Sequence, residues 1–299
     1  MVEALGQSGG AGVAAGVTFQ NAAMTVMVLS LLVMAIWLVR VLANPSALSL
    51  SQTPNRPNSV NPLHLLAIIA VWFGAQFVAT HAYLNATGQE FPPAPPPGDE
   101  PDPNATLRSQ LNVIAGLTGQ PVLLAAAMVA AAMTFRLGFQ RGLGLSMRHW
   151  FYDGLRGIVG LAVLLPMVFG VLLATNVIIQ PYFPDLVKPH ALLEAAKNLA
   201  LPWKIATVFS AVVLAPLAEE IFFRGLMQSM FRKYLSRPWV AIFATSAIFA
   251  ALHPVNTIPA LLVLSLGLGY VYERSGRLVG PILMHALFNG INMSLLFMA

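Results

Sequence analysis

The sequence contains no cysteine and very little charge. With Cys 0 among 299 residues, disulfides, thiolate metal sites and cysteine nucleophiles are all excluded. Only 9% of the residues are charged and 57% are hydrophobic, whereas soluble domains are about a quarter charged. A single soluble core has too little volume to hide this much apolar surface, so the composition indicates a membrane protein.

Acidic residues are scarcer still than basic ones. The chain has 16 Lys and Arg against 11 Asp and Glu, a balance that on a soluble protein would suggest nucleic-acid binding. Here the basic residues lie mostly at the ends of apolar segments, where the preference of Lys and Arg for the cytoplasmic side of a membrane explains them. We therefore expect the lipid bilayer, and no nucleic acid, as a partner.

Long apolar segments account for most of the chain, and they predict an all-α membrane protein with about eight transmembrane helices. The segments lie at 21–42, 63–84, 110–135, 155–179, 203–231, 238–253, 256–272 and 278–298. The sixth and seventh are shorter than the roughly 20 residues that a span needs, so we expect them to be tilted, broken or buried among neighbours. No basic stretch precedes the first segment, which argues against a cleaved signal peptide.

Basic residues alternate along the loops. The first, third, fifth and seventh loops carry arginines, whereas the 85–107 loop has no Lys or Arg and contains seven prolines between positions 92 and 103. Counting Lys and Arg near the segment ends places the odd-numbered loops in the cytoplasm and both termini outside. We expect a bacterial cytoplasmic membrane, with an internal eukaryotic membrane as the alternative.

Two carboxylates, Glu219 and Glu220, lie deep within the apolar segment 203–231. A charge at membrane depth costs a few kcal/mol, so an intramembrane ionisable residue is a candidate for function by default. Glu220 and Arg224 are four residues apart and can pair on one helix face. Glu219 points about 100° away, lacks that partner and is the better candidate for a general base. Pro216, just upstream, is expected to kink the helix.

Polar residues at helical spacing also occur in two later segments. Phe249 and His253 are four residues apart, as are His285 and Asn289, so each pair shares a helix face. Counted at about 1.5 Å per residue from the nearest basic loop, these positions reach depths similar to that of Glu219. Two histidines, an amide and a carboxylate around one water molecule would activate that water and stabilise an oxyanion.

The remaining polar residues of the apolar segments are interpreted as structural. Nine of the eleven acidic residues lie in loops, tails or segment ends. Ser265, Gly267 and Gly269 are taken only as small residues that let helices approach closely. Asn292 is taken as structural, and Phe249 as packing beneath the site.

Three motifs in separate segments now resemble those of a known family. E-E-x-x-x-R at 219–224, F-x-x-x-H at 249–253 and H-x-x-x-N at 285–289 are similar to the motifs of the CAAX-protease and bacteriocin-processing family (CPBP, or Abi), which includes the type II CAAX prenyl endopeptidases. The match covers residues 203–298. It implies an eight-helix intramembrane endopeptidase that hydrolyses a peptide bond in a membrane-associated or lipidated protein or peptide.

The resemblance also implies a role for each motif residue. Glu219 works with His253 to activate the hydrolytic water, whereas His285 and Asn289 stabilise the oxyanion. Glu220 and Arg224 are supporting residues. The implied catalytic set is Glu219, Glu220, Arg224, His253, His285 and Asn289.

The family has also been described as metalloproteases. If a metal is present, its ligands would be Glu219, His253 and His285, since two histidines and a glutamate suit zinc. However, the His-Glu-x-x-His spacing is absent and asparagine is a poor zinc ligand. We favour a glutamate-activated water that requires no cofactor, with zinc as the alternative.

On this interpretation the chain has two regions. Residues 1–200 are an N-terminal membrane region of about four helices that includes the proline-rich loop at 85–107, and residues 201–299 are a CAAX-protease-like catalytic region. Two other functions remain: a non-catalytic scaffold or immunity protein on the same fold, and a transporter with an acidic midplane site. The intact catalytic set argues against the first, and the lack of a deep acid in the first four segments argues against the second.

Overall fold

The computed structural model describes residues 3–50, 53, 56–94, 102–146, 148–179, 181–182, 197 and 199–298. Within these ranges, seven helices are long and apolar enough to cross a membrane, and one shorter apolar helix spans Pro238–Ala251. The only strand-like feature of the same ranges is an isolated bridge between Asn58 and Phe135. The chain is therefore an all-α, multi-pass membrane protein, as the composition predicts.

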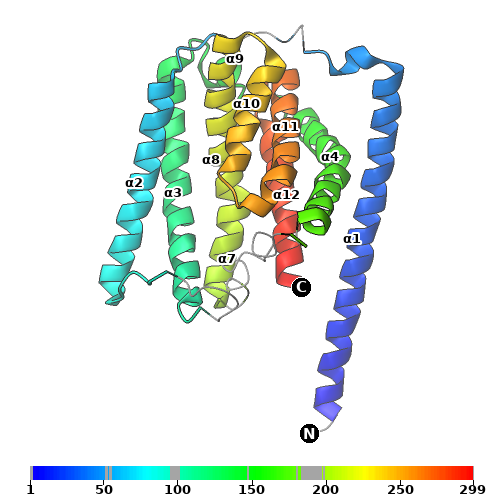
Figure 1. Ribbon diagram of the computed structural model, residues 1–299, viewed down its shortest axis with the longest axis vertical. Coiled ribbons are helices and arrows are strands. Elements are labelled where there is room, and N and C mark those ends of the chain that lie inside the picture. Colours follow the sequence, from blue (N-terminus) through cyan, green and yellow to red (C-terminus); the bar gives the residue numbers. More distant parts are fainter. Residues whose placement is uncertain are drawn as a thin grey trace.

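Figure 1 shows the order and arrangement of the helices. The long single helices are α1 (Glu3–Ala43), α2 (Pro62–Thr87), α3 (Ala105–Thr134), α4 (Trp150–Ile179), α10 (Pro238–Ala251), α11 (Ile258–Ser275) and α12 (Val279–Met298). The central rod, residues 201–235, consists of α7 (Leu201–Phe209), η3 (Ser210–Leu214), α8 (Ala215–Glu220), η4 (Ile221–Gln228) and α9 (Ser229–Leu235). Short turns are η1 (Pro45–Leu48), η2 (Gly138–Leu143) and η5 (Val255–Thr257).

All eight predicted segments coincide with a helix of the structure. The sixth, α10, is short as expected, with 14 residues. The seventh is longer than predicted, because η5 and α11 together extend over Val255–Ser275. The sequence pattern missed the last turn of this helix because Glu273 and Arg274 end the apolar run before the helix itself ends.

The helices pack around the central rod. α3 contacts the rod along most of its length, and α2 covers α3 on the outside. α12 and α10 contact the rod from other directions, α11 packs on both, and α4 packs on α11 and α12. α1 lies at the far edge of the bundle against α4 (Figure 1).

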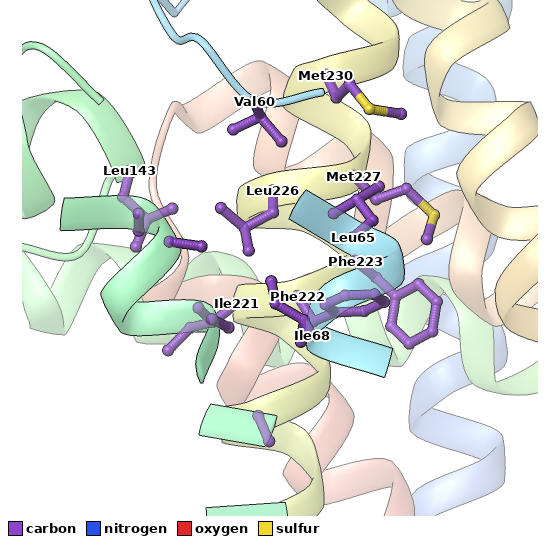
Figure 2. Close-up of a cluster of buried hydrophobic side chains, with 14 of the residues drawn as sticks. Val60, Leu65, Ile68, Leu143, Ile221, Phe222, Phe223, Leu226, Met227 and Met230 are labelled. Carbon is purple, nitrogen blue, oxygen red and sulfur yellow. The ribbon is translucent and has the colours of Figure 1, made fainter. Parts of the chain in front are cut away.

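A buried apolar cluster encloses η4 (Figure 2). Every side chain from Ile221 to Gln228 is buried, so this segment faces protein on all sides and not lipid. Its partners in the cluster include Val60, Leu65, Ile68 and Leu143. A Cβ atom on Gly225 would lie 2.7 Å from Leu143 Cδ1, so a larger residue here would push the end of the Leu143 side chain aside.

The arginine-bearing loops lie together at one end of the bundle, and both chain termini lie toward the other end (Figure 1). Two acids lie at helix ends of the arginine-bearing end, as expected, and both are buried there. Glu273 is 1% exposed and pairs with Arg56 at 3.5 Å and Arg232 at 3.1 Å. Asp153 is 1% exposed and pairs with Arg277 at 2.5 Å. The arginines taken as topology markers therefore also form buried ion pairs, and their cytoplasmic location stays a prediction.

Of the proline-rich loop at 85–107, residues 95–101 lie outside the described residues. On its near side, α2 ends at Thr87 and Gly88 follows with a positive φ of 65°. On its far side, Arg108 in the first turn of α3 pairs with Asp102 at 2.7 Å. This ion pair fixes the loop's exit to the start of α3.

Candidate active site

The central rod departs from α-helical geometry on both sides of the paired glutamates. η3, before them, and η4, directly after them, are π-helical. In η3 the N–H of Ala215 donates to the carbonyl of Ser210, five residues back. π-helical turns inside α-helices are often found at functional sites. The distortion predicted at Pro216 thus takes the form of a widened turn immediately upstream.

Asn289 of α12 is bonded to this widened turn. In a π register the N–H of residue 216 would donate to the carbonyl of Ala211, but Pro216 has no N–H. The side-chain Nδ2 of Asn289 donates to that carbonyl oxygen at 2.8 Å. Asn289 therefore satisfies the acceptor that the proline leaves open and ties α12 to the rod. An asparagine amide carries two N–H donors, so one remains for another acceptor.

Glu220 is fully buried and binds two partners. Arg224 Nη1 and His285 Nδ1 each lie 2.8 Å from the same oxygen, Glu220 Oε1. The side chains of Glu220 and Arg224 are both 0% exposed, which confirms the pairing predicted from their spacing. Arg224 Nη2 also donates to Ser265 of α11, at 2.7 Å to Oγ and 3.3 Å to the carbonyl oxygen. Ser265 is thus more than a small residue at a helix contact, contrary to the interpretation of the sequence.

Glu219 is the more accessible carboxylate. Its side chain is 17% exposed, and its Oε2 lies 3.9 Å from His285 Nε2. His253 also lies within electrostatic range of Glu219. The other carboxylate oxygen, Glu219 Oε1, accepts a hydrogen bond from Gln120 Nε2 on α3 at 3.4 Å. Glu219 therefore lies where α3, α8 and α12 meet, with histidines from two different segments near it.

His253 lies just after the end of α10, and its orientation is set locally. Its Nδ1 bonds the carbonyl oxygen of Phe249 at 2.8 Å. Because a carbonyl only accepts, Nδ1 carries the proton, and Nε2 of the neutral ring is left as an acceptor. The Phe249 ring packs against both His253 and His285, with ring centroids 4.8 and 5.8 Å apart. The predicted packing role of Phe249 is confirmed, since its buried ring contacts both histidines.

Gln120 was not identified from the sequence. One glutamine in a long apolar helix carries no motif signal, and its contact with Glu219 spans 99 positions of the chain. Its Oε1 is buried and has no hydrogen-bond partner among the described residues, and the same holds for Glu220 Oε2 and Arg224 Nε. Buried polar atoms of native proteins nearly all have a partner, so we expect water to bind at these atoms.

The residues named as zinc ligands in the alternative reading do not form a ready metal site. Within the described residues, no group of three or more His, Asp or Glu side chains is arranged to hold a metal ion. Nδ1 of His253 is bonded to a carbonyl and Nδ1 of His285 to Glu220, which leaves Nε2 of each ring open, as in histidines that bind metals. The three side chains are nevertheless not grouped closely enough to hold an ion in this arrangement.

A comparison with protein families now assigns this part of the chain. Residues 201–291 match the family model described as type II CAAX prenyl endopeptidase Rce1-like. This part of the chain is therefore similar to that family, and we refer to residues 201–291 as the Rce1-like domain. It extends from the start of the central rod into α12 and contains all three motifs. α3, with Gln120, lies outside the Rce1-like domain but contributes to the same site.

Two curated relatives share part of the chain. An uncharacterized 24.3 kDa protein of Escherichia coli is 32% identical over 121 residues, which is 39% of this chain and 53% of the relative. The UPF0177 protein YaiF of Lactococcus lactis is 28% identical over 135 residues, 41% of this chain and 60% of the relative. The chain thus spans little more than half the length of these relatives. No solved structure matches it significantly.

Proposed function

We propose that this protein is an intramembrane endopeptidase that hydrolyses a peptide bond in a membrane-associated or lipidated protein or peptide. One observation carries the proposal: the partly exposed carboxylate of Glu219 lies 3.9 Å from His285 Nε2, with His253 in range, inside a membrane-length helix. The match to the Rce1-like family supports the same reaction class. A buried ion-pair network with no chemical role would not require an accessible second carboxylate.

In the proposed mechanism Glu219 is the general base. It takes one proton from water while His253 Nε2 accepts the other O–H, so that the water oxygen attacks the carbonyl carbon. The oxyanion receives hydrogen bonds from the protonated ring of His285 and from the free N–H of Asn289. Glu219 then delivers its proton to the leaving amine, so the two products together gain one water. Glu220 holds the His285 ring in place through its 2.8 Å bond to Nδ1.

Substitution of the base tests this function. Glu219→Gln keeps the size of the side chain but removes its basicity, so cleavage should fall by about 10²- to 10⁴-fold, the usual contribution of general acid–base catalysis. The measurement compares protein termini and membrane fragments in cells that produce wild type or variant, and then cleavage of the identified substrate by purified protein. Glu90→Gln, an exposed glutamate outside the bundle, is the matched control and should cleave like wild type.

The result also separates the proposal from its main rival. Equal cleavage by Glu219→Gln and wild type, at equal amounts in the membrane, would contradict the mechanism. If wild type itself changed no termini, the non-catalytic scaffold would be the better reading.

The zinc alternative has its own test on the same substrate. Because the mechanism above uses only protein groups and water, incubation with a chelator followed by its removal should leave the cleavage rate unchanged. Complete loss of activity that zinc alone restores would establish metal dependence.

A further inference from the structure

A groove lies between α1, α4, α10 and α11, away from the residues of the candidate active site. Its volume is about 720 Å³, within the range of about 300–1,000 Å³ that is usual for ligand sites. Its walls are mainly aliphatic, and its lining contains two arginines, Arg156 and Arg274, and no acidic residue. Such a groove suits a ligand with a long apolar part and a negative end.

The depth of the groove matches one leaflet of a bilayer. Arg156 is in the second turn of α4 and Arg274 is in the last turn of α11, so both are at the same end of the bundle. The deepest lining residues of these helices are Met167 and Val263, each eleven positions from the arginine. At 1.5 Å per residue this is about 16 Å, roughly half of the 30 Å hydrocarbon core.

Aromatic residues place the arginine end at the membrane surface. Trp239 at the start of α10 and Tyr270 of α11 both line the groove, and their rings stack with centroids 5.6 Å apart. Trp37, from the last turns of α1, lines the groove as well. Trp and Tyr are enriched where hydrocarbon meets headgroups, so this end of the groove lies at headgroup level.

The positive charge at this end is only partly neutralised. The Arg156 side chain is 62% exposed and lies 3.4 Å from Asp153. Asp153 also pairs with Arg277, so one carboxylate serves two guanidinium groups. Arg274 is exposed and donates to the carbonyl oxygen of Ser49 at 2.8 Å, a neutral acceptor. Both lining arginines therefore retain N–H donors for an anion.

We propose that this groove binds one anionic phospholipid from the leaflet at the arginine end. The phosphate lies between Arg156 and Arg274, and an acyl chain follows α4 past Val159 toward Met167. Basic pockets between transmembrane helices bind lipid headgroups in this way. A second apolar groove of about 870 Å³, between α1, α4, the rod and α12, has no charged side chain in its lining and serves as an internal contrast.

Native mass spectrometry of the purified full chain tests the proposal. The protein is mixed in neutral detergent with palmitoyl-oleoyl phosphatidylglycerol or with the matching phosphatidylcholine, and retained lipid is counted against lipid concentration. We expect one phosphatidylglycerol to be held more tightly than phosphatidylcholine. The double variant Arg156→Gln/Arg274→Gln should bind it about 30-fold more weakly, since each basic residue near an anionic lipid contributes about fivefold.

Two further variants keep the test specific. Arg141→Gln/Arg148→Gln removes the same charge from two exposed arginines of the same end that do not line the groove, and should bind phosphatidylglycerol like wild type. Val159→Trp fills the groove without a change of charge, and should abolish lipid retention while the helical circular dichroism is unchanged.

Several outcomes would overturn the proposal. Equal retention of the two lipids would show that the groove does not select for charge. Equal loss in the Arg141/Arg148 control would assign the effect to the general surface potential. Undiminished binding by Val159→Trp would place the lipid elsewhere, and displacement by millimolar inorganic phosphate would identify a small-anion site with no acyl chain in the groove.

Discussion

At the scale of the residue, Glu219 and Glu220 show how two adjacent glutamates differ in role. A rotation of about 100° per residue turns Glu220 toward Arg224 and His285, where it is fully buried, and leaves Glu219 partly exposed beside Gln120. Glu220 is held by two charge-assisted bonds, which suits a fixed anchor. Among the described residues, Glu219 accepts one weaker bond, from a neutral amide, and lies 3.9 Å from His285, so its carboxylate can take part in proton transfer.

Gln120→Leu tests the residue that lies outside the Rce1-like domain. Gln120 donates to Glu219 Oε1 and so orients the base toward water. A hydrogen bond to a charged group contributes about 1.5–3 kcal/mol, so we expect turnover to fall by roughly 10- to 100-fold with KM unchanged. Steady-state kinetics on the substrate found with Glu219→Gln would measure both constants.

The control for this prediction is on the same helix. Gln110 is also half-buried in α3, and its Oε1 accepts from Tyr83 near the proline-rich loop. Gln110→Leu should leave turnover and KM as in wild type. A similar loss in both variants would mean that α3 tolerates no leucine at these positions, and would remove the specific role of Gln120.

At the scale of the element, the π-helical turn η3 and α12 are matched to each other. Pro216 removes one backbone donor, and Asn289 supplies a donor to the carbonyl of Ala211 that this leaves open. A helix with a proline near its middle would otherwise carry an unsatisfied carbonyl in a region without water. The helix thus stays distorted beside the glutamates, and the interhelical bond from Asn289 offsets the lost backbone hydrogen bond.

This match predicts an energetic coupling between two residues. Asn289→Ala should lower the free energy of unfolding by about 1–3 kcal/mol, because Ala211 loses its partner. In a Pro216→Ala background the new N–H can donate to that carbonyl, so the same change should cost less. Thermal unfolding in detergent of wild type, the two single variants and the double variant gives the coupling energy between Pro216 and Asn289. We expect it to exceed about 0.5 kcal/mol.

Asn292, also on α12, provides the control for this double-mutant comparison. Its Nδ2 donates to the carbonyl of Phe288 within its own helix at 2.9 Å. Asn292→Ala should therefore show no coupling to Pro216→Ala. Zero coupling for Asn289 as well would contradict the role of Asn289 as the donor that replaces the missing N–H of Pro216.

At the scale of the whole molecule, a buried polar stripe connects the site to the arginine-bearing end. Glu220, Arg224, Gln228 and Arg232 succeed one another at four-residue steps along the rod, facing α11. On α11, the backbone of Gly269 and the side chain of Glu273 accept from Gln228, and Glu273 also pairs with Arg232. Arg56, from the loop between α1 and α2, closes the stripe on Glu273.

Glu273→Ala should therefore destabilise the fold as a whole. The change leaves Arg56 and Arg232 buried without their carboxylate, and breaking a buried pair typically costs about 3–5 kcal/mol. We expect a clearly lower Tm in detergent, together with faster proteolysis of the loop that carries Arg56. Glu90→Ala, which removes an exposed carboxylate, should leave both properties unchanged. An unchanged Tm for Glu273→Ala would show that the stripe contributes no net stability.

Features that depend on near neighbours along the chain could be predicted from the sequence alone. Segment length and apolar composition predicted the eight helices, because a membrane span needs a continuous apolar stretch and nothing else. The four-residue spacing of Glu220 and Arg224 predicted their ion pair, because one helical turn brings them together whatever surrounds them. The order of the three motifs identified the region that matches the Rce1-like family.

The distant residues that complete the site could be identified only from the packing of the helices. Gln120 meets Glu219 across 99 positions, Asn289 meets Ala211 across 78, and Arg224 meets Ser265 across 41. The burial of Asp153 and Glu273 likewise depends on arginines from other loops. Such contacts depend on how the helices pack side by side, and helical periodicity along one segment carries no record of which segment lies against it.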